Sequence, residues 1–431
     1  MYDEIVTKQN HGISANIITL LPLVGLFLIA GLTGILPQQV TSYTVIVCLI
    51  LLLLTPYTYL AYPIVIFYYT QFGNIFGVSV FRVYTIIFLM SLIIRRKKKL
   101  SISVDSLIPF YVLFIYIIVN IFAISVRTAI FLLLDIICIY LLISEYLRET
   151  ENLKIFFRVY CITMFLSFFT GLITNNSREQ IAVFSGSYTS FIRFCGTFED
   201  PNYMGFFFLI GVFAIVTLNL FSKRTSKIMT IISYVMIMFG LSITSIVTSI
   251  VVWGTYLVIA KKIRPKTIIV ILTIFILLTV IYNYGLSHSN IPIVGPLSLR
   301  INDKLIVLES RDFATVTTRR SSLTLEHFTY FLDQSIFRIL FGGNLVNTKL
   351  LAGFQQVAHN EYVDMLLNVG ILGTATMLAF LIRRTFILYK AYKKTHEDKY
   401  LFALMCKVIW GTYAFTLTMF LDYRFLLLFL I

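Results

Sequence analysis

The sequence contains little charge. Charged residues make up 13% of its 431 residues, whereas soluble globular proteins contain about 25%. Hydrophobic residues make up 58%, and the mean hydropathy is +0.89. This composition excludes an ordinary soluble globular protein, because such a chain has too few polar side chains to cover its apolar ones.

Acidic residues are especially scarce, with 20 against 35 basic ones and a formal net charge of +15. Eighteen of the basic residues lie in four short junctions between apolar runs, at residues 95–99, 222–227, 261–266 and 383–399. Basic residues beside apolar spans mark the cytoplasmic side of a membrane. We therefore place these junctions in the cytoplasm and expect no nucleic-acid partner.

Cysteine is also scarce, and its placement indicates no special chemistry. Cys195 alone lies in an expected loop, whereas the others, Cys48, Cys138, Cys161 and Cys406, lie in apolar runs. No Cys or His spacing is typical of a metal site. We expect no disulfide framework, no metal and no cofactor.

Apolar runs close to the length of a membrane helix recur along the whole chain. They lie at residues 17–36, 41–55, 57–71, 79–94, 107–124, 128–143, 154–173, 201–221, 228–243, 245–260, 266–284, 361–382 and 401–421. Pro56 and Pro63 interrupt the runs between 41 and 71, which leaves twelve or thirteen spans. The sequence thus predicts an all-α, polytopic integral membrane protein with a single domain over residues 1–431.

Two sizeable segments fall outside the membrane when crossings are counted from the cytoplasmic junctions. The smaller external loop is residues 174–200, and the large external loop is residues 285–360. A connection of about 75 residues is longer than compact proteins usually contain without a role for it. Within this loop, residues 321–332 have a helical pattern and predict a helix on the membrane surface.

Three external stretches carry the polar residues that could gather over the membrane bundle. They are RFCGTFEDPN at 193–202, TTRRSSL at 317–323 and AHNEYVDMLLNVGILG at 358–373. In order and spacing they resemble the O-antigen polymerase and O-antigen ligase superfamily. The residues that carry the resemblance are Arg193, Gly196, Asn202, Arg320, Gly342, Gly343, His359, Asn360, Gly370 and Gly373. One departure is the Ser/Thr-rich stretch at 244–249, where a family member often carries an arginine.

The resemblance implies a fold like that of the C-type membrane glycosyltransferases. It also implies transfer of a glycan from a polyprenyl diphosphate carrier to a sugar hydroxyl, on the external face of the cytoplasmic membrane of a bacterium. The implied partners are the lipid-linked glycan, membrane lipid, and assembly proteins such as a flippase and a chain-length regulator. We favour a polymerase making O-antigen, capsule or exopolysaccharide over a ligase that uses the same donor.

The residue types suit this reaction without reference to the family. An arginine fork binds phosphate oxygens in two places at once, and the candidates are Arg193, Arg320 and its neighbour Arg319. A neutral imidazole accepts a proton near pH 7, so His359 is the candidate general base toward the acceptor hydroxyl. Asn202 and Asn360 are weaker candidates for contacts with substrate.

Each candidate also has a structural interpretation. External arginines are commonly solvated, or they form ion pairs, here with Glu199, Asp200 or Glu326. Asn360 is a favoured N-cap, and Asp200 followed by Pro201 is a strong helix-start signal. Gly342 and Gly343 are typical of a chain reversal, and Gly370 and Gly373 of close helix packing. The remaining histidines, His11, His288, His327 and His396, are interpreted as surface residues.

A transporter for the same lipid-linked unit is the alternative from another class. Transporters typically show internal repeats and ionisable residues at mid-span. The sequence shows no repeat, and Asp135 is the clearest acidic residue within a span.

Overall fold

The computed structural model describes residues 126–141, 149–184, 187–260, 265–288, 293–309, 320–343 and 358–417. It also describes a few isolated positions, including the paired strands β1 (Asn74–Ile75) and β2 (Val78–Ser79). The five expected spans before residue 126 lie almost entirely outside the described residues, as does Arg319.

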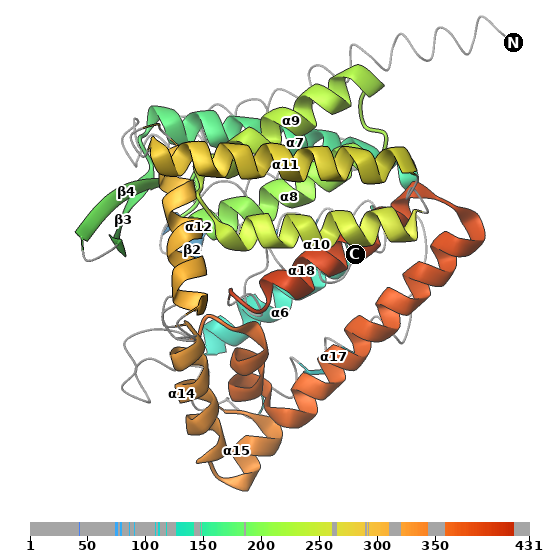
Figure 1. Ribbon diagram of the computed structural model, residues 1–431. Helices are drawn as coiled ribbons and strands as arrows, with labels where there is room; N and C mark the ends of the chain where they lie inside the picture. The colour runs from blue at the N-terminus through green and yellow to red at the C-terminus, as the bar shows by residue number, and fades with distance from the viewer. Residues whose placement is uncertain are drawn as a thin grey trace, which may run out of the picture. The chain divides into compact units, whose positions relative to one another are not determined.

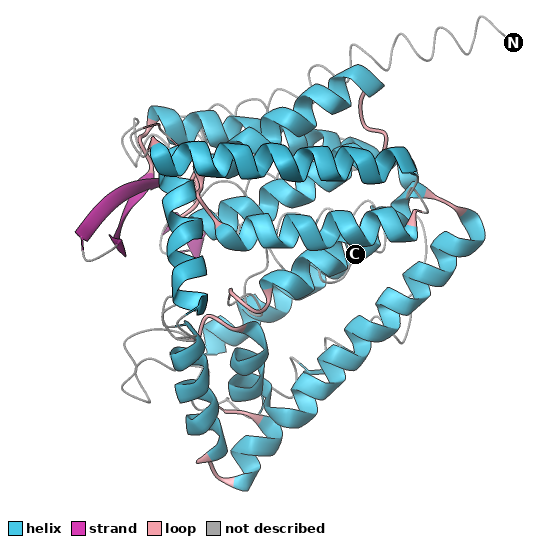
Figure 2. Cartoon of the chain, in the orientation of Figure 1, coloured by secondary structure: helices cyan, strands magenta, loops and turns pink. Residues whose placement is uncertain are grey.

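The described chain is mostly helical, as the apolar runs predict (Figure 2). Eight of the expected spans correspond to helices, namely α6 (Val126–Leu141), α7 (Thr150–Ile173), α8 (Pro201–Thr217), α9 (Lys223–Phe239), α10 (Ile243–Ile259), α11 (Pro265–Ser287), α17 (Glu361–Thr395) and α18 (Asp398–Tyr413). Among the residues searched, α7 and α17 are long and apolar enough to cross a membrane. Helices α8 and α10 are apolar but shorter.

The segment 174–200 contains a β-hairpin that hydrophobic patterning did not predict (Figure 1). Strands β3 (Ser177–Phe184) and β4 (Ser187–Phe194) pair antiparallel, with Arg178 directly opposite Arg193. The strands contain several β-branched and aromatic residues, which favour a pleated sheet. The hairpin therefore places two arginines side by side on one face.

The segment 285–360 contains helices as well. They are α12 (Val294–Glu309), α14 (Arg320–Leu332) and α15 (Ile336–Phe341). Helix α14 confirms the helix expected over residues 321–332. Both α14 and α15 pack against α17 (Figure 1).

The chain forms two compact units. In one, Asn176 after α7 donates hydrogen bonds to the carbonyls of Gly196 and Phe198, at 2.8 and 2.9 Å. The other contains the hairpin and helices α8 to α18. There α8 is buried along almost its whole length and packs against α9, α10 and α18. A helix that is apolar on all sides is stable where protein neighbours or lipid surround it, and here α9, α10 and α18 surround α8.

Gly370 interrupts α17 with φ 68° and ψ −174°. The helix expected over residues 361–382 is present, but it bends at Gly370, which the apolar pattern does not show. A Cβ on Gly370 would collide with the backbone of Leu340, and a Cβ on Gly342 with that of Asn368. Gly342 and Gly370 thus allow the backbone at the end of α15 to lie directly against the backbone at the bend in α17.

We predict that Gly370→Ala destabilises the protein. This backbone conformation is essentially restricted to glycine and costs another residue about 1–3 kcal/mol, and the collision with Leu340 adds to this. Gly254→Ala is the control, because Gly254 lies within α10 and, apart from that helix's own backbone, no atom of the described residues lies within 4 Å of its added Cβ. Thermal unfolding of the purified protein should show a lower Tm for Gly370→Ala only. An unchanged Tm would show that the bend tolerates a side chain.

Candidate functional site

The beginning of α8 is fixed by Asp200 and Pro201. The Asp200 carboxylate accepts a hydrogen bond from the amide of Asn202 at 2.7 Å, and Pro201 occupies the first helical position. This confirms the helix start expected from the sequence. It places Asn202 in the first turn of α8.

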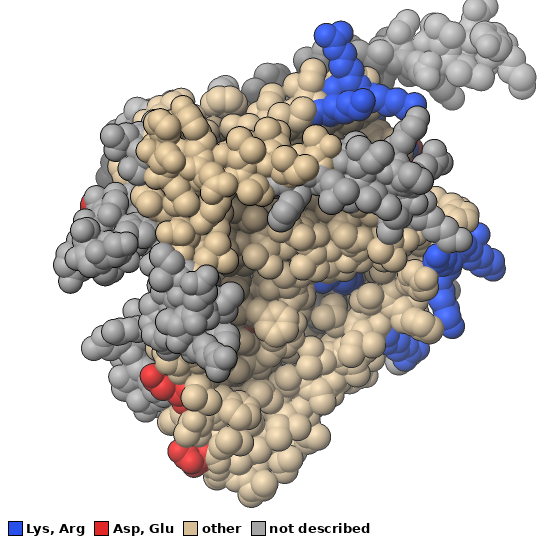
Figure 3. Space-filling model, in the orientation of Figure 1, with Lys and Arg blue, Asp and Glu red and all other residues tan. Residues whose placement is uncertain are grey.

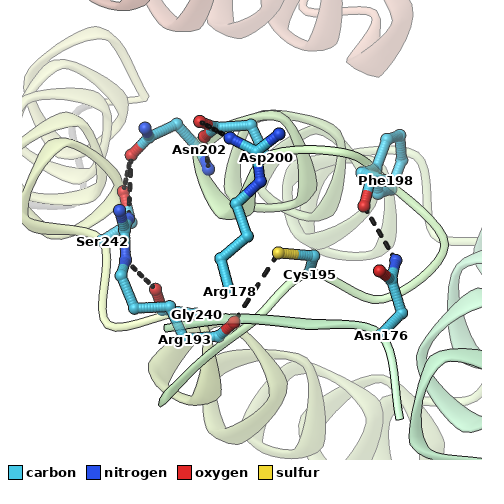
Figure 4. A network of polar contacts seen from close by, with 9 residues as sticks. All are labelled: Asn176, Arg178, Arg193, Cys195, Phe198, Asp200, Asn202, Gly240 and Ser242. Atoms are coloured by element: carbon cyan, nitrogen blue, oxygen red, sulfur yellow. Dashed lines mark hydrogen bonds and ion pairs between the residues drawn. The ribbon is translucent and has the colours of Figure 1, made fainter. Parts of the chain in front are cut away.

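The side chain of Asn202 is a buried polar junction, with only 3% of the residue exposed (Figure 4). Its Oδ1 accepts hydrogen bonds from Ser242 Oγ at 2.7 Å and from Arg193 Nη2 at 3.4 Å. Its Nδ2 is buried and has no hydrogen-bond partner among the described residues. A buried donor without an acceptor is costly, so this amide is suited to a ligand oxygen.

Two arginines from distant parts of the chain meet at the end of α9. Arg193 Nε donates to the carbonyl of Gly240 at 3.2 Å, and Arg300 Nη1 donates to that of Leu241. A helix C-terminus carries partial negative charge, which favours cations beside it. Arg300 belongs to α12 and was not among the candidates from the sequence, since no motif surrounds it.

Ser242 connects this turn to Asn202. It is the N-cap of α10, where its Oγ accepts from the amide of Ser245 at 3.2 Å while it donates to Asn202. Arg300 brings a guanidinium to the carbonyl of Leu241, the residue before Ser242.

Three arginines contribute contacts to this network. Arg178 lies opposite Arg193 in the hairpin and forms an ion pair with Asp200 at 3.8 Å, although 59% of the Arg178 side chain is exposed. Like charges directly across a sheet are unfavourable, and the Asp200 carboxylate offsets part of this repulsion. The beginnings of α8 and α10 add the partial positive charge of two helix N-termini. We define Arg178, Arg193, Asn202, Ser242 and Arg300 as the arginine cluster.

The charged groups of the cluster affect the pKa of the neighbouring Cys195 thiol. Its thiol is fully buried and donates to the carbonyl of Arg193 at 3.6 Å. The pKa of Cys195 is raised to about 11, mainly by burial and also by the negative charge of Asp200, while Arg178 and Arg193 act in the opposite direction. The thiol is therefore an inert part of the site at neutral pH.

His359 lies in a turn that neighbouring elements hold in place. It is half-buried with φ 51°, and the carbonyl of Ala358 before it accepts a hydrogen bond from Thr324 of α14 at 3.2 Å. Asn360 caps α17, since its Oδ1 accepts from the amides of Tyr362 and Val363 at 3.0 and 3.3 Å. The capping interpretation of Asn360 is confirmed. We call residues 358–360 the histidine turn.

Helix α18 joins the arginine cluster to the histidine turn. Tyr413, the last residue of α18, donates a hydrogen bond from its hydroxyl to Ser245 Oγ at 2.7 Å. The carbonyl of the following residue, Ala414, accepts a hydrogen bond from the amide of Glu361 at 2.7 Å. Through Ser245 and Ser242 these bonds continue to Asn202. Two motifs that are more than 150 residues apart in sequence are thus connected by polar contacts.

The remaining candidates from the sequence are Arg319, Arg320, Gly342 and Gly343. Arg320 is the first residue of α14, one turn before Thr324; its contact with phosphate stays a prediction, as does that of Arg319. The amides of Gly342 and Gly343 donate to the carbonyls of Arg338 and Leu367. This pattern agrees with a chain reversal.

His327 corrects one interpretation from the sequence. It is fully buried rather than on the surface, and its Nδ1 lies 2.7 Å from the carbonyl of Leu323. His288 and His396 are exposed, as expected, and His11 lies outside the described residues. Helical periodicity alone did not show which face of α14 packs against α17.

Comparison with known proteins adds no relative. No model of a known protein family matches the chain, and neither the curated proteins nor the solved structures include one with significant similarity.

We predict that Cys195 resists thiol reagents in the folded protein. With a pKa of about 11, about one thiol in a thousand is ionised at pH 8, and this fraction rises about tenfold per pH unit up to the pKa. Asp200→Asn removes a charge that raises the pKa, so labelling should be faster, while asparagine still caps α8. Maleimide labelling between pH 7 and 9, in a variant with Cys195 as its only cysteine, measures the rates. Fast, pH-independent labelling of the folded protein would contradict this assignment.

Proposed function

We propose that the protein is an integral membrane glycosyltransferase that polymerises a lipid-linked glycan. It transfers the growing glycan from a polyprenyl diphosphate to a sugar hydroxyl of a lipid-linked repeat unit. The observation that carries the proposal is the arginine cluster, with the buried Asn202 amide, connected by hydrogen bonds to the histidine turn. The chain's resemblance to the O-antigen polymerase and ligase superfamily supports the same reaction.

Exposed apolar stripes support a location within the membrane. On α9, Ile228, Ile231, Ile232 and Val235 follow helical spacing and are 42–64% exposed. Apolar faces of this kind mark contact with lipid or protein, and broad areas in Figure 3 carry no charged side chain. Lys390, Lys393 and Lys394 lie near the end of α17, at one of the junctions that we place in the cytoplasm. The histidine turn at the opposite end of α17 is then external.

The arginine cluster would bind the diphosphate of the donor. Guanidinium groups hold phosphate oxygens through paired hydrogen bonds, and helix N-termini favour anions. Asn202 Nδ2 would donate to one phosphate oxygen. These groups would stabilise the negative charge that develops as the carrier departs, and such preorganised contacts are often the largest source of rate enhancement.

The histidine turn would activate the acceptor. As the acceptor oxygen forms its bond to the anomeric carbon, the bond between that carbon and the diphosphate oxygen breaks. The acceptor proton passes to His359, and the polyprenyl diphosphate leaves with the electron pair. A diphosphate is a good leaving group, so positioning and charge stabilisation supply most of what this step needs.

Two alternatives use the same lipid-linked glycan. A ligase would transfer it to a different lipid or to a protein. A transporter would carry it across the membrane, and Lys407 favours this candidate, because ionisable residues buried within a span often serve transport. Lys407 is 4% exposed on α18.

We predict that His359→Ala, Arg193→Ala and Arg300→Ala each abolish long glycan in a strain that lacks the protein and is complemented with the variant. Loss of a general base lowers a rate by about 10²–10⁴-fold, and loss of an oxyanion-stabilising donor by about 10²–10³-fold. Arg320→Ala tests the remaining candidate. Glycans are resolved by size at matched membrane expression.

Lys394→Ala, on an exposed residue at the far end of α17, is the control and should make glycan of normal length. Single repeat units left on the lipid support the polymerase. Full-length glycan retained on the carrier would identify a ligase. Loss of external repeat units, together with an effect of Lys407→Ala, would identify a transporter. Long glycan from the His359 and arginine variants would contradict the proposal.

A further inference from the structure

Helices α8, α10 and α18 meet at one buried point. Gly205 of α8, Ser245 of α10 and Tyr413 of α18 lie there, and a Cβ on Gly205 would overlap the Ser245 hydroxyl and crowd that of Tyr413. Ser245 and Tyr413 are both fully buried. The absence of a side chain at Gly205 thus leaves room for one hydrogen bond, from Tyr413 to Ser245.

The ring and the hydroxyl of Tyr413 have separate contacts. The ring packs edge to face against Phe206 at 5.1 Å between centroids, which a phenylalanine would retain. The hydroxyl donates to Ser245 Oγ at 2.7 Å. A buried hydroxyl needs such a partner, so this bond fixes how the end of α18 lies against the beginning of α10.

The end of α18 in turn holds the beginning of α17. Its last carbonyls accept two hydrogen bonds, from the amide of Glu361 to Ala414 at 2.7 Å and from the hydroxyl of Tyr362 to Gly411 at 3.0 Å. Glu361 follows the histidine turn directly. A rotation or shift of the last turn of α18 would therefore move His359.

We propose that Tyr413 is a positioning residue that sets the place of His359 relative to the arginine cluster. It touches neither donor nor acceptor. Its hydroxyl ties α18 to Ser245 and Ser242, which hold Asn202, while the following residue ties α18 to Glu361. The effect of Tyr413 on catalysis rests on the proposed function. The hydrogen bonds that connect Tyr413 and Ala414 to Ser245 and Glu361 do not depend on that function.

The experiment compares Tyr413→Phe with the wild type in the full-length protein. The expected result is glycan elongation in membranes slowed about tenfold, with unchanged binding of polyprenyl diphosphate, because the arginine cluster keeps its own contacts. Hydrogen exchange at the amide of Glu361 should become faster. Thr217→Val is the matched control, since it removes a buried hydroxyl that, among the described residues, donates to Phe213 within α8, and it should change none of the three readouts.

Ser245→Ala removes the other partner of the bond. Its effect on elongation should not add to that of Tyr413→Phe, because both variants break the same contact. Unchanged exchange at Glu361 in Tyr413→Phe would overturn the inference, as would equal losses of elongation and of diphosphate binding. If the wild type itself elongates no glycan, the proposed function fails, while the exchange measurement still decides whether Tyr413 holds the histidine turn.

Discussion

The carboxamide of Asn202 is the interaction on which the site depends. It lies among apolar helices, where an unpaired polar group costs several kcal/mol on apolar transfer scales, roughly 1–3 in mutational data. Its oxygen is satisfied by Arg193 and Ser242, so the hairpin and the beginning of α10 must both come to the first turn of α8. Asp200 holds that turn by capping it. The hairpin, α8 and α10 therefore form one polar assembly, to which α12 adds Arg300.

The ends of α8, α9 and α10 bring their partial charges to this polar assembly. The beginnings of α8 and α10 offer amide groups and partial positive charge, and the end of α9 offers the carbonyls that hold Arg193 and Arg300. Helix α18 extends the same polar network to the histidine turn. We propose that the arginine cluster binds the donor diphosphate and that His359 accepts the acceptor proton. The hydrogen bonds that connect the two regions would then hold both groups in place for transfer.

Much of this arrangement could be predicted from sequence. Apolar runs predicted the helices, and the Asp200–Pro201 pair and Asn360 predicted two helix starts correctly. Arg300 could not be found in this way, because its contact with Leu241 joins residues 59 apart and leaves no local pattern. The hairpin was missed since its alternation is weak beside long apolar runs. The bend at Gly370 was missed because φ depends on the tertiary approach of Leu340.

Binding of a polyprenyl diphosphate to the purified protein, followed by native mass spectrometry, tests the central claim most directly. The account predicts a one-to-one complex that survives Lys394→Ala and is lost or weakened at least tenfold in Arg193→Gln and in Asn202→Leu. It also predicts weaker binding of the corresponding monophosphate. Equal binding of diphosphate by the wild type and both cluster variants would show that the arginine cluster serves structure alone.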